Sequence, residues 1–205
     1  MKKSLLMLPI ALIVMAMALT ACGGGSSSSS SSGGGEDAAI EEAIETSATG
    51  TDPSKCTEVQ TENFNETETG KSGAAALKAC EEEAEEGSEP AESVTVTNVE
   101  IIEGDGAAAE VEIEGGTLGG QTVAVAMEKE EGDWKLDGFM GFTKYDPASL
   151  AASLEEKLGE EEGISSELAA CITEGVEELP EAEVEALVFE KNNEGFEEIA
   201  TACNE

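Results

Sequence analysis

Five cysteines are the first candidates for chemistry in this 205-residue chain, at positions 22, 56, 80, 171 and 203. No two of them have the Cys-x-x-Cys spacing that is typical of redox-active pairs. The chain has no histidine, so the commonest general acid/base and the commonest metal ligand are both missing. This pattern argues against a zinc site and against a redox centre. It leaves anchoring and structural cross-linking as the expected uses of the thiols.

Other catalytic signatures are also missing from the sequence. It contains no P-loop, no Gly-x-Gly-x-x-Gly turn and no Gly-x-Ser-x-Gly elbow. Gly104-Asp105-Gly106 is interpreted as a hairpin turn, because it lacks the regular run of acidic ligands of a calcium loop. Carboxylates are so abundant that a chance pair of them carries no information. We therefore predict no catalytic residue, no metal site and no cofactor, and we do not expect an enzyme.

The charge of the chain is strongly acidic, with 46 Asp and Glu residues against 10 basic residues and a formal net charge of −36. All the basic residues are lysines. Nucleic-acid binding requires clustered cations, so no nucleic-acid partner is expected. We interpret the acidic residues as a solvated coat that keeps the protein soluble. The alternative is a weak cation-binding surface with many sites.

The N-terminus has the layout of an export signal. Lys2 and Lys3 precede the apolar run 5–19, and Leu19-Thr20-Ala21-Cys22 closes it. This ending resembles the lipobox of bacterial lipoproteins. The resemblance implies cleavage of a signal peptide, residues 1–21, and lipid attachment to Cys22. It also implies a place on the cell membrane, facing the extracytoplasmic side. The alternative is an uncleaved helical anchor, since about seventeen apolar residues could just span a bilayer.

Export would leave four cysteines in an oxidising space, beyond a Gly/Ser-rich linker at residues 22–36. Four cysteines allow three disulfide connectivities. Pairing Cys56 with Cys80 and Cys171 with Cys203 keeps each bridge within one half of the chain, and we favour it. Both bridges are predicted to be structural staples.

The pattern of apolar residues after the linker predicts helices followed by strands. The helices are expected at 37–46, 56–64 and 72–86. The strands are expected at 93–102, 107–114, 122–129 and 134–142, with a bulge near Asn98 where the alternation changes phase. Alternation is clearest in the second and third strands, which predicts one buried and one polar face.

This order of elements, closed by the hairpin sequence Glu131-Gly132-Asp133-Trp134-Lys135-Leu136, resembles exported NTF2-like domains, which share the fold of SnoaL and ketosteroid isomerase. The resemblance covers residues 37–143. It implies an α+β cone in which a curved antiparallel meander of about four strands wraps a helix and leaves a pocket. The blander alternative is an unrelated antiparallel sheet with helices on one face. The expected pocket lining is Val111, Ile113, Val123, Val125, Met127 and Trp134.

Residues 146–205 are predicted to form an all-α tail. Leu150, Leu154 and Leu158 recur at helical spacing, and Ser165 and Pro180 are placed to start further helices. The whole chain is therefore expected to be a lipid-anchored binding module for a small apolar molecule or an envelope protein. The alternatives are a spacer protein of the envelope and a small enzyme that uses carboxylates alone.

Overall fold

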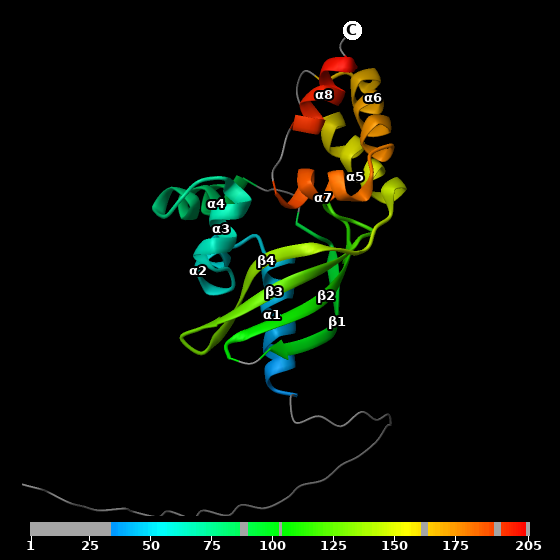
Figure 1. Cartoon of the computed structure of the whole chain (residues 1–205). Coiled ribbons are helices and arrows are strands. Elements are labelled where there is room, and N and C mark those ends of the chain that lie inside the picture. Colours follow the sequence, from blue (N-terminus) through cyan, green and yellow to red (C-terminus); the bar gives the residue numbers. More distant parts are fainter. Residues whose placement is uncertain (1–33, 87–89, 103, 161–163, 191–193, 204–205) are drawn as a thin grey trace, which may run out of the picture. The chain divides into compact units, whose positions relative to one another are not determined.

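The computed structural model describes residues 34–86, 90–102, 104–160, 164–190 and 194–203 (Figure 1). The predicted signal peptide, residues 1–21, and the predicted lipidation site at Cys22 lie outside the described residues. Gly34 and Gly35 belong to the predicted linker 22–36. The first helix begins at Glu36, the residue at which that linker was expected to end. The fold is α+β, with an antiparallel sheet and a helical C-terminal region.

Helices precede the sheet in the chain: α1 (Glu36–Thr49), α2 (Lys55–Glu58), α3 (Glu62–Thr69) and α4 (Ala74–Glu86). The prediction of one helix over 56–64 was wrong, because the chain leaves the helical conformation after α2. The Leu136 amide donates to the Val59 carbonyl at 2.9 Å, and the Thr61 amide donates to the Leu136 carbonyl at 3.0 Å. The Thr61 hydroxyl then accepts from the Phe64 amide at 3.0 Å and caps α3. Pairing with the sheet therefore interrupts the helix.

The four strands form a meander: β1 (Ser93–Ile102), β2 (Gly106–Glu114), β3 (Thr122–Glu130) and β4 (Asp133–Lys144). Every neighbouring pair is antiparallel. The predicted bulge near Asn98 is confirmed, since the register shifts between Thr97 and Glu100 and Asn98 has a φ of 50°. The four-stranded sheet predicted from the alternation is also present.

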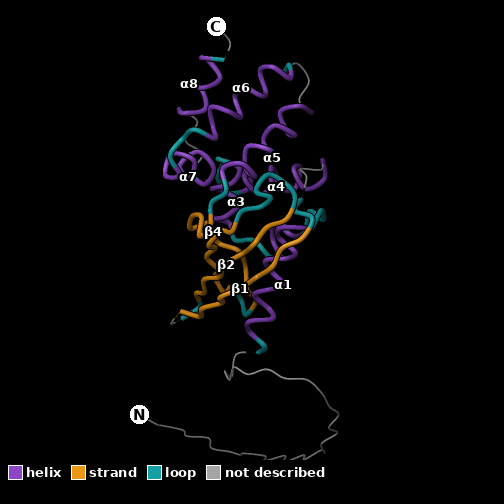
Figure 2. Tube along the Cα trace, turned by 90° about the vertical axis from the view of Figure 1, so that its right-hand side faces the viewer, coloured by secondary structure: helices purple, strands orange, loops and turns teal. Residues whose placement is uncertain are grey.

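The main apolar core lies between α1 and one face of the sheet. Ile40, Ala43 and Ile44 of α1 are almost fully buried, and α1 contacts β1 and β4 (Figure 2). The alternating residues of β2 and β3 supply the opposite wall, because successive side chains of a strand point to opposite faces. The glutamates of β2 therefore lie on the other face.

The C-terminal region contains α5 (Pro147–Glu160), α6 (Ser166–Glu177), α7 (Glu181–Phe189) and α8 (Glu194–Ala202). Ser165 caps α6, as its sequence position predicted, by accepting from the Leu168 amide at 3.2 Å. Pro180 stands at the start of α7. A second, smaller core cluster joins α5 and α6 through Leu158, Ala169, Ile172 and Val176, and Phe196 and Ile199 of α8 pack against it.

The C-terminal helices join the sheet through α7 and the start of α5. The Phe189 ring of α7 lies 4.8 Å from Phe142 and 5.3 Å from Phe139, both in β4. Glu185 accepts a hydrogen bond from the Phe142 amide at 2.8 Å. The fully buried Gln121 accepts from the Asp146 amide and donates to its carbonyl. Of these residues, Phe139 also lines the cavity described next.

Candidate ligand-binding cavity

A cavity of about 280 Å³ lies between the sheet and the helices that precede it. Pockets for small molecules usually span about 300 to 1,000 Å³, so this one suits a small ligand or part of a larger one. Helices α1, α2, α3 and α4 and strands β2, β3 and β4 contribute to its wall. Its apolar lining includes Ile44, Phe64, Val123, Leu136 and Phe139.

The structure places four of the six predicted lining residues on the wall of this cavity. Val111, Ile113, Val123 and Val125 lie on the wall of this cavity. Met127 and Trp134 do not line it, although both are buried, with exposed fractions of 2% and 5%. They therefore belong to the packed core and not to the cavity.

The sheet register shows where the two groups lie along the strands. Val111 pairs with Val123, whereas Met127 pairs with Ala107 and Leu136, and Trp134 pairs with Lys129 near the hairpin between β3 and β4. Alternation identifies the face of a strand to which a side chain points. It does not say where along the strand the covering helices leave space.

The only cation on the described wall of the cavity is Lys55, at the start of α2. Its ammonium group donates to the Gly50 carbonyl at 2.8 Å and to the Ser47 carbonyl at 3.3 Å. Burial lowers the pKa of Lys55, because removal of water disfavours the charged form, while the carboxylate of Glu83 acts in the opposite direction. Much of the hydrogen-bonding capacity of this ammonium group is thus used within the protein.

The side-chain amide of Gln60 extends the polar part of the wall. Its Nε2 donates to the Ser47 hydroxyl oxygen at 2.8 Å, and only 6% of the residue is exposed. Its Oε1 lies 3.2 Å from the Cys80 sulfur. Because that sulfur belongs to a disulfide and carries no hydrogen, this contact provides no proton to the amide oxygen.

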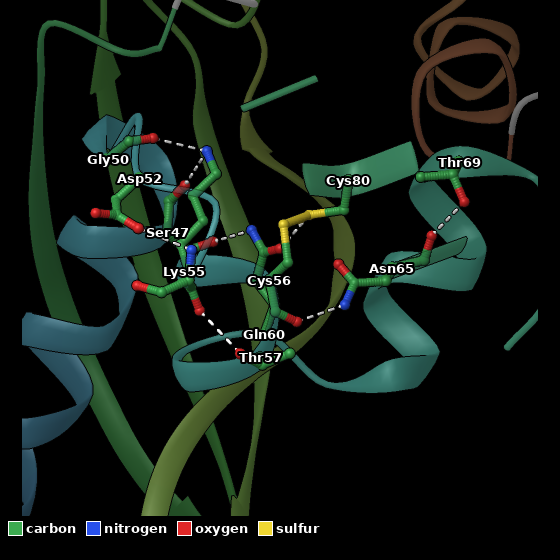
Figure 3. Close-up of a disulfide and its surroundings, with 11 residues drawn as sticks. Ser47, Gly50, Asp52, Lys55, Cys56, Thr57, Gln60, Asn65, Thr69 and Cys80 are labelled. Carbon is green, nitrogen blue, oxygen red and sulfur yellow. Dashed lines mark hydrogen bonds between the residues drawn. A yellow bond between two sulfur atoms is a disulfide. The ribbon is translucent and has the colours of Figure 1, made fainter. Parts of the chain in front are cut away.

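Asn65 of α3 has an unusual buried amide. Its Nδ2 donates to the Cys56 carbonyl at 2.7 Å, which determines the orientation of the amide, as Figure 3 shows. Its Oδ1 is buried and has no hydrogen-bond partner, and 4% of the residue is exposed. A buried amide oxygen without a donor costs about 1 to 3 kcal/mol. A hydrogen-bond donor that reached this oxygen would remove this cost.

The wall around Asn65 and Gln60 is thin. Both residues also line a cavity of about 340 Å³ on the other side, to which Cys56, Glu130 and Lys135 contribute. The Cys56–Cys80 disulfide ties α2 to α4 at this point (Figure 3). It thereby holds the two polar amides against the sheet.

The second disulfide, Cys171–Cys203, connects α6 with the residue after α8. The structure thus has the favoured connectivity, with one bridge in each half of the chain. Each bridge limits how far two segments can separate in the unfolded chain. It thereby lowers the conformational entropy of the unfolded state and stabilises the fold.

Sequence analysis did not single out Lys55, Gln60 or Asn65 as wall residues. Each lies in a short helix or a connection, where no periodic pattern distinguishes inward from outward positions. The proximity of Gln60 and Asn65 to Cys56 in the sequence was the one available signal, since a disulfide buries its neighbours.

Comparisons with protein-family models, with curated proteins and with solved structures found no match to this chain. Within the described ranges, every helix is too short or too polar to span a membrane. No cluster of three or more metal-ligating side chains is present in the same ranges.

Proposed function

We propose that this chain is a lipid-anchored binding protein whose cavity holds a small, mainly apolar molecule. The observation that supports this most directly is the cavity itself, with its apolar floor on the sheet and the unpartnered Asn65 oxygen in its wall. Pockets of this kind, apolar with a few placed polar groups, are typical of small-molecule sites.

The proposal includes an NTF2-like class for the α+β part. It is supported by the order of elements, with helices before a four-stranded antiparallel meander, and by α1 packed on the sheet face that also lines the cavity.

Binding is favoured over catalysis by the state of the polar groups on the wall. The Lys55 ammonium contacts two backbone carbonyls, and the Gln60 amide contacts the Ser47 hydroxyl. Such groups position a ligand, whereas a general base requires a free lone pair near a reacting proton.

The membrane anchor rests on Cys22 and the sequence before it. Replacement of Cys22 by serine would remove the thiol that accepts the lipid. We expect Cys22→Ser to move the protein from the membrane fraction to the soluble fraction, or to leave it as an uncleaved precursor. Mature-sized protein that stays in the membrane fraction would contradict the lipid anchor.

The binding function can be tested with N-phenylnaphthylamine, a neutral probe whose fluorescence rises in apolar surroundings. We expect saturable fluorescence with the wild type and strongly reduced fluorescence with Ala48→Phe, because Ala48 lies on the cavity wall. Ala39→Phe is the matched control, because Ala39 is exposed on the same helix. Equal probe binding by the two variants would overturn the proposed site.

A further inference from the structure

A second cavity, of about 470 Å³, adjoins the first. Their walls share Glu68, Thr117, Leu118 and Phe139. These shared residues come from α3, from the β2–β3 connection and from β4, and they lie between the two spaces. A ligand that passes Phe139 and Leu118 would occupy both.

The two cavities differ in polarity. The first has Ser47, Lys55, Gln60 and Asn65 on its wall. In the second, Glu68 and Thr117 are the only polar residues among the described lining, and both belong to the shared part. The remaining wall comes from the C-terminal helices and is apolar, with Leu150, Leu154, Val176, Leu187, Val188 and Phe196. Polarity therefore falls from the first cavity to the second.

The polar residues of the first cavity indicate which kind of polar group a ligand would carry. Asn65 Oδ1 lacks a donor, and the disulfide sulfur gives none to Gln60 Oε1. Both oxygens require a hydrogen-bond donor such as a hydroxyl. Glu68 and Glu83 lie on the same wall, and Lys55 already donates to two carbonyls. A negatively charged head would therefore meet two carboxylates and one ammonium group that already donates to carbonyls, so this wall favours a neutral head over an anionic one.

From these observations, and resting on the proposed binding function, we infer that the ligand is a single-chain amphiphile with a neutral, hydroxyl-bearing head. The head would lie beside Asn65 and Gln60. The hydrocarbon chain would pass Phe139 and enter the apolar cavity under the C-terminal helices. Monoacylglycerols have this chemistry and serve as probes.

The first test compares chain lengths in displacement of N-phenylnaphthylamine. Monopalmitoylglycerol reaches both cavities, whereas monooctanoylglycerol fills only the first. We expect the palmitoyl compound to bind at least about tenfold more tightly, because each added buried CH₂ favours binding. Equal affinities would overturn the inference but leave the proposed binding function intact. Failure of the probe and of both compounds to bind would overturn the binding function itself.

The second test blocks only the apolar cavity. Leu187→Trp places a large side chain in the second cavity without touching the first. We expect it to abolish the advantage of the palmitoyl over the octanoyl compound and to leave octanoyl binding within about twofold of the wild type. Glu183→Trp, at an exposed position of the same helix, is the control and should keep the advantage. Retention of the advantage in Leu187→Trp would contradict the inference.

The third test addresses the head group with matched ligands. Methylation of both hydroxyls of monopalmitoylglycerol removes the donors and keeps the oxygen acceptors. We expect this dimethyl ether, and palmitate at neutral pH, to bind at least about tenfold more weakly than the parent compound. Equal binding of the ether would refute recognition by the amide oxygens. Tighter binding of palmitate would refute the neutral head.

Discussion

The sheet with its preceding helices and the C-terminal helices each carry one disulfide, but the two bridges lie beside different interiors. Cys56–Cys80 adjoins a large core that contains buried polar amides and a cavity. Cys171–Cys203 closes a helical cluster whose buried apolar core is small. The first region can retain its fold through the sheet. The second depends more on its cross-link, because little apolar surface is buried there.

The largest expected effect comes from removal of a disulfide. The chain-entropy model gives about 3 to 4 kcal/mol for each bridge, with the loops set by sequence separations of 24 and 32. We expect Cys171→Ala with Cys203→Ala to expose the amides of α8 to hydrogen exchange. Cys56→Ala with Cys80→Ala should leave the amides of β2 and β3 protected. If the α8 amides stay protected without Cys171 and Cys203, the C-terminal helices do not depend on their disulfide as we expect.

The two buried glutamines provide the next comparison. Gln121 uses both ends of its amide on the backbone of Asp146, so Gln121→Leu removes two hydrogen bonds. The Asp146 amide is left without an acceptor, while the Asp146 carbonyl still accepts from the Leu150 amide. We expect a loss of about 2 to 3 kcal/mol in the free energy of unfolding, measured by urea denaturation.

Gln60→Leu is the matched variant in the other region. Gln60 makes one donor contact, to Ser47, and its oxygen receives no hydrogen from the disulfide. The expected loss is below about 1 kcal/mol, because removal of an unsatisfied acceptor offsets removal of the bond. A loss as large as that of Gln121→Leu would show that the Gln60 oxygen is satisfied in the free protein.

A loss of stability smaller than that of Gln121→Leu is expected where α6 and α8 approach closely. A Cβ atom at Gly175 would lie 2.6 Å from Cγ2 of Ile199. We expect Gly175→Ala to destabilise the protein by about 1 kcal/mol, since the overpacking outweighs the gain in helix propensity. Gly159→Ala in α5 meets no neighbour and should be neutral or stabilising. Thermal unfolding of both variants measures this, and stabilisation by Gly175→Ala would contradict the close packing.

The smallest expected effect is a pH dependence from Lys55. Its pKa is lower in the folded protein because of burial, so the unfolded chain binds more protons at alkaline pH. The free energy of unfolding should therefore rise as pH increases from the lowered pKa of Lys55 toward 10.5, the ordinary value for lysine. Over this pH range, the urea midpoint of the wild type should rise relative to the urea midpoint of Lys55→Met. A difference that is constant with pH would contradict the burial of the charge.

Much of the fold follows from periodicity. The alternation in β2 and β3 predicted which residues face the core, and the phase change predicted the bulge at Asn98. The C-terminal leucines at helical spacing predicted α5. These features are local, because the geometry of a strand or helix repeats within the segment itself. The interruption at Thr61 was missed because it depends on a strand far along the chain.

The candidate site was predictable only in part. Val111, Ile113, Val123 and Val125 were placed on the wall by their strand face. Met127 and Trp134 share the apolar character and belong to the same core, but they do not line the cavity. Position along a strand relative to a covering helix is a tertiary property, so periodicity could not separate the two groups.

By itself, the sequence determined the acidic charge, the absence of histidine, the strand faces and the even set of cysteines after Cys22. These follow from composition and from local backbone geometry. Only the tertiary structure decided which cysteines pair and where a cavity remains. It also brought Lys55, Gln60 and Asn65 to one wall. The disulfides and the cavity join segments far apart in the chain, and the positions of the wall residues depend on how the helices pack on the sheet.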